Sequence, residues 1–145
     1  MCLTDIMKRT NMKYTPSINI AQTTFNPAGY IVTQNALGVV GKIVDSFNAG
    51  VHSFNIIGSY GTGKSNFILA LEHGLQKGNK LLTNKGQFNG FVRFRFEKIV
   101  GDYASLQKVL TEHLFPTNAS DNLFENLRLY FKQAEKREEF VVIVI

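Results

Sequence analysis

The segment from Gly58 to Ser65, which reads GSYGTGKS, constrains the fold of this chain more than any other feature. Glycine accepts positive φ angles and lets the backbone approach a ligand with no Cβ in the way. Successive N–H groups in such a turn form a concave site for anions, and a helix beginning at Lys64 would add the positive end of its dipole. The segment therefore predicts a phosphate-binding loop between a strand and a helix.

The residues on either side of this loop have the pattern that it requires. His52–Ile57 is a short, largely apolar run typical of a strand. After Lys64, apolar residues from Phe67 to Leu75 occupy nearly every side of a helix, so we expect this helix to be largely buried.

Two further elements are predicted on the two sides of this unit. Apolar residues recur at helical spacing over 33–50, with Thr33 able to cap the start and Gly50 marking the end. Phe91–Phe96 alternates instead, with its apolar residues on one face and Arg93 and Arg95 on the other. This alternation indicates a strand with one less buried face.

The C-terminal part continues the alternation of helices and strands. A helix that ends before Pro116 is followed by a second helix, capped by Ser120 or Asp121. Phe140–Ile145 is a run of consecutive apolar residues, as a parallel strand buried on both faces requires. Strands that alternate with helices predict an α/β fold around a mainly parallel sheet.

The loop matches the pattern G-x-x-x-x-G-K-[ST], in which each fixed position has a chemical role. Lys64 is expected to reach the β- and γ-phosphates as a point charge and so to act as the catalytic residue of the site. The Ser65 hydroxyl is placed to bind Mg²⁺ between the same phosphates. The expected nucleotide-binding residues are Gly58, Ser59, Tyr60, Gly61, Thr62, Gly63, Lys64 and Ser65.

These residues resemble the Walker A motif of the P-loop NTPases, and Phe140–Ile145 resembles the apolar strand of their Walker B motif. The resemblance implies a three-layer α/β/α core with a mainly parallel sheet, in a branch similar to the AAA+ and RecA-like ATPases. In that superfamily an acidic residue follows the Walker B strand. We therefore expect an incomplete core: an irregular N-terminal arm over 1–32, and over 33–145 the N-terminal part of a nucleotide-binding domain.

The resemblance also implies a function. We expect an ATP-binding domain of a larger ATPase, with ATP and Mg²⁺ as cofactors, that binds nucleotide without appreciable turnover on its own. Two alternatives stay open: a nucleotide-gated, DNA-associated regulatory module, and a small-molecule kinase. Assembly into a homo-oligomer and contact with nucleic acid are open in the same way.

Three other segments bear on the choice of nucleotide and metal ligand. Asn84–Gln87 resembles a guanine-recognition motif but lacks its aspartate, which favours ATP over GTP. Asp102 is an alternative acidic residue for the metal, although the run before it is not apolar. Tyr30–Val32 lies where related ATPases pack on the adenine, and ordinary packing of the arm explains it equally well.

Composition excludes several other classes. At 145 residues, 44% hydrophobic and 19% charged, the chain is long enough for one globular domain. A single cysteine, Cys2, allows neither a disulfide framework nor a thiolate metal site, and no apolar run is long enough for a membrane span. A cytoplasmic protein is expected. The basic stretch between Lys77 and Lys98 is interleaved with phenylalanines, and we interpret it as a solvated basic face rather than a nucleic-acid surface.

Overall fold

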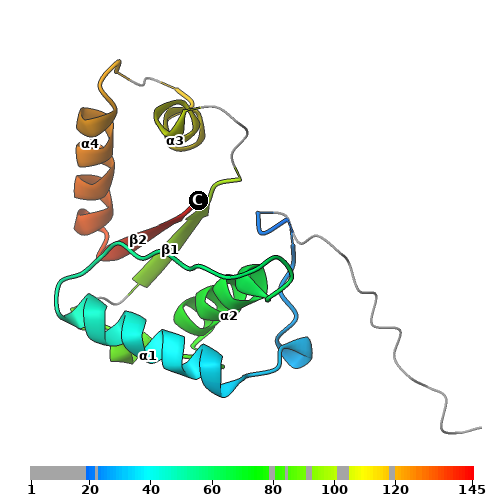
Figure 1. The fold of residues 1–145 in the computed structure, drawn as a ribbon. Coiled ribbons are helices and arrows are strands. Elements are labelled where there is room, and N and C mark those ends of the chain that lie inside the picture. The colour runs from blue at the N-terminus through cyan, green and yellow to red at the C-terminus, as the bar shows by residue number, and fades with distance from the viewer. Residues whose placement is uncertain are drawn as a thin grey trace, which may run out of the picture.

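A two-stranded parallel sheet lies at the centre of the described part of the chain (Figure 1). The computed structural model describes residues 19–21, 23–78, 81–83, 85–90, 93–100, 105–117 and 120–145. Over these residues the protein is a mixed α/β structure with four α-helices. In chain order, the elements are α1 (Gln34–Asn48), α2 (Lys64–Lys77), β1 (Arg93–Lys98), α3 (Leu106–Leu114), α4 (Leu123–Lys136) and β2 (Glu139–Val144), with short 3₁₀ turns at Pro27–Gly29 and Lys85–Gln87.

The two faces of the sheet contact different helices. Phe94 of β1 and Phe140 of β2 are register partners, and the Phe140 ring lies 5.0 Å from the Phe47 ring of α1. The residues that alternate with Phe94 along β1 point the other way, where Glu97 accepts a hydrogen bond from Tyr130 of α4. Figure 1 shows α1 and α2 on one side of the strands and α3 and α4 on the other. This arrangement follows from the alternation of side chains along a strand.

Helix α1 confirms the predicted helix and its cap. The Thr33 side chain accepts a hydrogen bond from the Ala36 N–H at 3.1 Å, which satisfies one of the free donors of the first turn. Its buried side chains recur at helical spacing, so one stripe of the helix faces the core. They are Ala36, Val40, Val44 and Phe47.

Helix α2 also begins at the predicted residue, Lys64, and is largely buried as expected. It ends at Gly78, which adopts the left-handed conformation (φ 69°) that terminates many helices.

The cap of α4 differs from the prediction. Asn122, and neither Ser120 nor Asp121, is the N-cap, and its side chain accepts hydrogen bonds from the Phe124 and Glu125 N–H groups. Ser120 instead bonds to Asn126, whose side-chain oxygen accepts its N–H and whose amide donates to its carbonyl. Asparagine is as good a cap as serine or aspartate, so local preference could not separate the three candidates.

The predicted strand at His52–Ile57 is not a strand in the structure. Residues 51–59 carry no helix or ladder, and Figure 1 shows them drawn out between α1 and α2. A strand needs a neighbour to accept its backbone hydrogen bonds. His52 reaches Phe140 of β2, but the rest of the segment and β2 line a cavity, and the described residues include no strand that pairs with this run.

Strand β2 pairs in parallel with β1, as predicted, but it is not completely buried. Within it only Val141 is buried, and the other residues are half-buried. The reason is the small size of the sheet, because β2 has a neighbouring strand on one edge only within the described chain.

Four phenylalanines form the centre of the core between the sheet and α1. Phe47 packs edge-on against Phe88 at 5.1 Å, and Phe88 packs edge-on against Phe94 at 5.3 Å. Phe140 completes the group, 5.9 Å from Phe94. Phe88 and Phe94, which belong to the basic stretch, therefore face the core, as the alternation predicted for Phe94.

The interpretation of that stretch as a solvated basic face is correct for Lys77 and Arg93, which are exposed, and wrong for Arg95 and Lys98. Lys98 donates to Glu72 of α2 at 2.7 Å, with both side chains mostly covered. Arg95 lies between two glutamates, from β1 and β2, and stacks over the Tyr130 ring, 4.9 Å from its centre. Glu72 and Glu139, which lie far from these residues along the chain, neutralise the charges together with the neighbouring Glu97, and spacing along the sequence gives no sign of the two distant partners.

Tyr130 gives a prediction for stability at high pH. Burial raises the pKa of Tyr130 from 10 to about 12, helped by its hydrogen bond to Glu97 and by the charge of Glu97, whereas Arg95 acts in the opposite direction. The folded state therefore favours the neutral phenol. This contribution is complete below the unfolded pKa of about 10 and is lost as the pH rises towards about 12.

Urea denaturation at about pH 9 and about pH 11.5 is expected to show a smaller loss of stability for Tyr130→Phe than for wild type, since phenylalanine has no proton to lose. Equal losses in the two proteins would contradict this assignment. Tyr30, whose pKa burial also raises, is present in both proteins and cancels in the comparison.

The structure describes only part of the N-terminal arm. Residues 1–18 lie outside the described residues, and so do Cys2 and Asp102. From residue 23 the arm is irregular up to the 3₁₀ turn at Pro27–Gly29, where the Asn26 side chain accepts the Ala28 N–H. Within the described chain, no helix is long and apolar enough to cross a membrane.

Candidate functional site

The predicted loop forms a glycine turn that leads directly into α2. Gly61 and Gly63 have φ angles of 80° and 81°, in the left-handed region where a side chain would be strained. Gly63 is the N-cap of α2 and has no side chain to bond the free N–H groups of the first turn. Those groups and the positive end of the helix dipole meet at one point, as an anion site requires.

Gly58 is required for a different reason. A Cβ at this position would lie 2.9 Å from the Thr62 hydroxyl oxygen, which is closer than a real Cβ contact. The two sides of the loop therefore approach one another at Gly58 and Thr62. All three glycines have a structural role, two through their φ angle and one through this close approach.

Lys64 folds back over the loop. Its ammonium nitrogen donates to the Gly58 carbonyl at 2.6 Å and to the Ser59 carbonyl at 2.7 Å. The Thr62 hydroxyl donates to the same Ser59 carbonyl at 2.8 Å. Sequence reasoning gave Thr62 a place among the nucleotide-binding residues but missed these contacts. The position of a threonine three residues after Ser59 is the one signal that could have suggested its bond.

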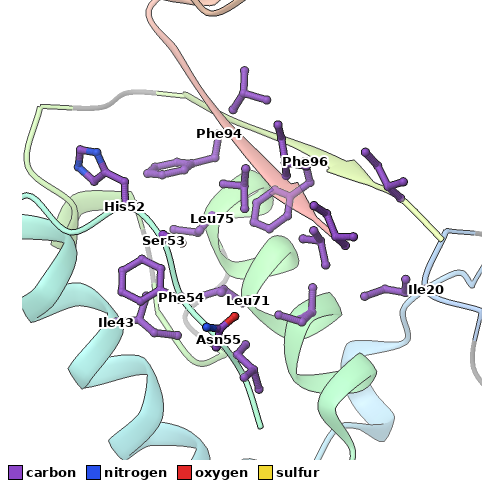
Figure 2. Close-up of a pocket in the computed structure, with 18 of the residues that line it drawn as sticks. Ile20, Ile43, His52, Ser53, Phe54, Asn55, Leu71, Leu75, Phe94 and Phe96 are labelled. Carbon is purple, nitrogen blue, oxygen red and sulfur yellow. The ribbon is translucent and has the colours of Figure 1, made fainter. Parts of the chain in front are cut away.

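Lys64 and Ser65 also line a cavity of about 1110 Å³. Figure 2 shows Phe94 and Phe96 of β1 facing Leu71 and Leu75 of α2 across it. Consecutive residues of two segments complete its walls: 52–57 on one side and 140–145 on the other. The C-terminal end of the loop therefore borders a large, mostly apolar space.

The donor set fits a magnesium nucleotide. Ser65 lies in the first turn of α2, half-buried and next to Lys64. In the described chain no group of three or more His, Cys, Asp or Glu side chains could hold a metal ion alone. Mg²⁺ commonly takes one or two protein ligands together with substrate phosphates and water, so the Ser65 hydroxyl can hold the ion only with a phosphate ligand.

The other residues predicted to lie near the nucleotide are Tyr60 and Tyr30–Val32. Tyr60 is 87% exposed beside the loop. Tyr30 packs against Phe25, with ring centres 5.9 Å apart, and Phe25 in turn lies against His73 of α2. Ile31 is exposed, so the structure shows ordinary packing for Tyr30 and an exposed apolar side chain beside it.

The histidines lie among aromatic rings or near a carboxylate. The His52 ring packs against those of Phe47 and Phe140, with ring centres 4.8 and 5.6 Å apart. His113 of α3 lies 3.7 Å from Glu97.

Comparisons with protein-family models, with curated proteins and with solved structures find no match for this chain.

Proposed function

We propose that this chain binds Mg-ATP through the loop Gly58–Ser65, as the nucleotide-binding part of a larger ATPase with a three-layer P-loop core. The observation that carries the proposal is the geometry of the loop. Two left-handed glycines turn the chain into the N-terminus of α2 while Lys64 folds over the turn. Backbone N–H groups, a helix N-terminus and a lysine then converge on one small volume, which suits a chain of phosphates.

Lys64 is positioned to transfer its hydrogen bonds to the ligand. It now donates to two neutral carbonyls, Gly58 O and Ser59 O. Phosphate oxygens carry negative charge and accept stronger hydrogen bonds than carbonyls do. The hydrogen bonds of Lys64 would therefore be stronger to the β- and γ-phosphates than to the carbonyls, and Ser65 beside it would hold the magnesium ion.

The position of β2 supports the ATPase branch of the proposal. Val144 and Ile145, at the carboxyl end of this strand, line the same cavity as Lys64 and Ser65. In open parallel α/β sheets, ligands bind at the carboxyl ends of the strands. The strand that resembles a Walker B strand thus ends on the side of the sheet where the phosphates would lie.

A small-molecule kinase is less well supported. Such an enzyme needs cationic groups around the acceptor to neutralise the transferred phosphoryl group. Lys64 is the only lysine or arginine among the described residues of the cavity wall, and most of that wall is apolar. The same wall offers no charged track for a nucleic-acid backbone.

A titration of the protein into a fluorescent ATP analogue tests the proposal. We expect saturable binding in the presence of Mg²⁺, displaced by unlabelled ATP and weakened by excess EDTA. Binding that ATP cannot displace would contradict the proposed function.

Ser65→Ala is expected to remove most of the magnesium dependence. Among the described residues this hydroxyl is the one predicted protein ligand of the ion, so its loss should weaken binding about tenfold with Mg²⁺ and little in EDTA. Ser53→Ala is the matched control, because it removes the same hydroxyl from another residue that lines the cavity. Equal losses for Ser65→Ala with and without Mg²⁺ would argue against the metal role.

A further inference from the structure

The Ser59 carbonyl is the point at which the loop's internal hydrogen bonds converge. It accepts the Thr62 hydroxyl at 2.8 Å and the Lys64 ammonium at 2.7 Å, and the Thr62 N–H lies 3.5 Å away. A carbonyl oxygen has two lone pairs, so the two side chains fill its capacity. The oxygen of this peptide group is therefore directed at the side chains of Thr62 and Lys64.

Nucleotide binding would remove only one of the two side-chain hydrogen bonds to the Ser59 carbonyl. Under the proposed function, on which this inference rests, Lys64 leaves the Ser59 carbonyl for the phosphates. The Thr62 hydroxyl is then the remaining side-chain donor to that carbonyl. If the peptide group turned over, its oxygen would face the phosphates, and two negatively charged groups would repel each other at short range.

The surroundings of Thr62 hold its hydroxyl in place. A Cβ at residue 58 would lie 2.9 Å from Thr62 Oγ1, so the absence of a side chain at Gly58 makes room for the hydroxyl. Threonine is also stiff at χ1 because two heavy atoms branch from its Cβ. The hydroxyl is thus directed at Ser59 by its own rotamer preference and by the space left at Gly58.

We propose that Thr62 is a positioning residue that keeps the Ser59 carbonyl turned away from the phosphates and so keeps the anion site assembled before and after Lys64 moves. Its contribution is pre-organisation: the loop does not have to reorder when the ligand arrives. Thr62 touches the nucleotide in neither state through this hydroxyl and acts through the peptide group of Ser59.

Two substitutions separate the hydroxyl from the shape of the side chain. Thr62→Val keeps the branched shape and removes the donor, whereas Thr62→Ser keeps the donor and removes the methyl group. We expect the Kd of the fluorescent ATP analogue to rise about three- to tenfold in Thr62→Val and to stay within about twofold of wild type in Thr62→Ser. Because Thr62 is exposed, both variants should unfold at the wild-type temperature.

Each outcome decides the inference. Wild-type affinity in Thr62→Val would overturn it, and so would equal weakening in the two variants, since the hydroxyl would then not be the cause. A lower unfolding temperature that accounts for the weaker binding of Thr62→Val would also overturn it, by assigning Thr62 a merely structural role. Failure of the wild-type protein to bind the analogue is a different result, because it refutes the proposed function and this inference with it.

Discussion

Lys64→Ala is expected to weaken binding of Mg-ATP about a hundredfold. The lysine would make two charge-assisted hydrogen bonds to phosphate oxygens, each contributing about 1.5 kcal/mol, and about 1.4 kcal/mol corresponds to a tenfold change in affinity. Alanine also frees the Gly58 and Ser59 carbonyls, which now accept from Lys64. The titration with the fluorescent analogue, repeated on the variant, measures the change.

Two further lysine variants make this result specific. Lys77 lies in the last turn of the same helix, α2, and is exposed, so Lys77→Ala removes an equal charge away from the loop and should bind as wild type does. Lys64→Arg keeps the charge but replaces a compact ammonium by a planar fork, and it should recover only part of the affinity. If Lys64→Ala and Lys77→Ala bound equally well, Lys64 would not be a phosphate ligand.

Phe94→Ala is expected to have the largest effect on stability, about 3–5 kcal/mol. Phe94 is only 7% exposed and packs against both Phe88 and Phe140, so truncation leaves a hole at the junction of sheet and core. Typical domains have a total stability of about 5–15 kcal/mol, so this loss is a large fraction of it. The midpoint of thermal unfolding should fall by about 10 °C or more.

Phe124→Ala is the matched control, because the same side chain is removed from a site that is 82% exposed on α4. It should change stability by no more than about 0.5 kcal/mol. Calorimetry of the two variants compares the stability lost on removing a buried phenylalanine with that lost on removing an exposed one. A similar loss in both would mean that the aromatic group around Phe94 is not the centre of the core.

The parts of the fold that could be predicted are those specified by neighbouring residues. The start of α2 at Lys64, the cap at Thr33 and the turn glycines follow from short-range chemistry, and the structure has them where the sequence indicates. The inward direction of Phe94 follows from alternation along a strand in the same way.

The parts that could not be predicted depend on residues that are distant in the chain. His52–Ile57 has the composition of a strand, but a ladder also needs a neighbour, and a cavity lies on that side of β2. The sequence indicates solvated side chains for Arg95 and Lys98 because two of their carboxylate partners, Glu139 and Glu72, are far from them along the chain, and Glu97 is the one nearby partner of Arg95.

The hydrogen bonds within the loop were missed for a related reason. The sequence pattern predicts that Lys64 contacts phosphates, but it does not predict where the Lys64 ammonium lies when no phosphate is bound. The structure supplies that position, on the Gly58 and Ser59 carbonyls, and with it the contact from which the role of Thr62 is inferred.

The most direct test of the account is an amide ¹H–¹⁵N NMR titration of the protein with Mg-ATP. We expect the largest shifts at the N–H groups of Gly61, Gly63, Lys64 and Ser65, because the phosphates would accept hydrogen bonds from this turn. Amides at the far end of α2, near Lys77, should move little. An unchanged loop, or shifts confined to another part of the molecule, would contradict the claim that Gly58–Ser65 is a phosphate site.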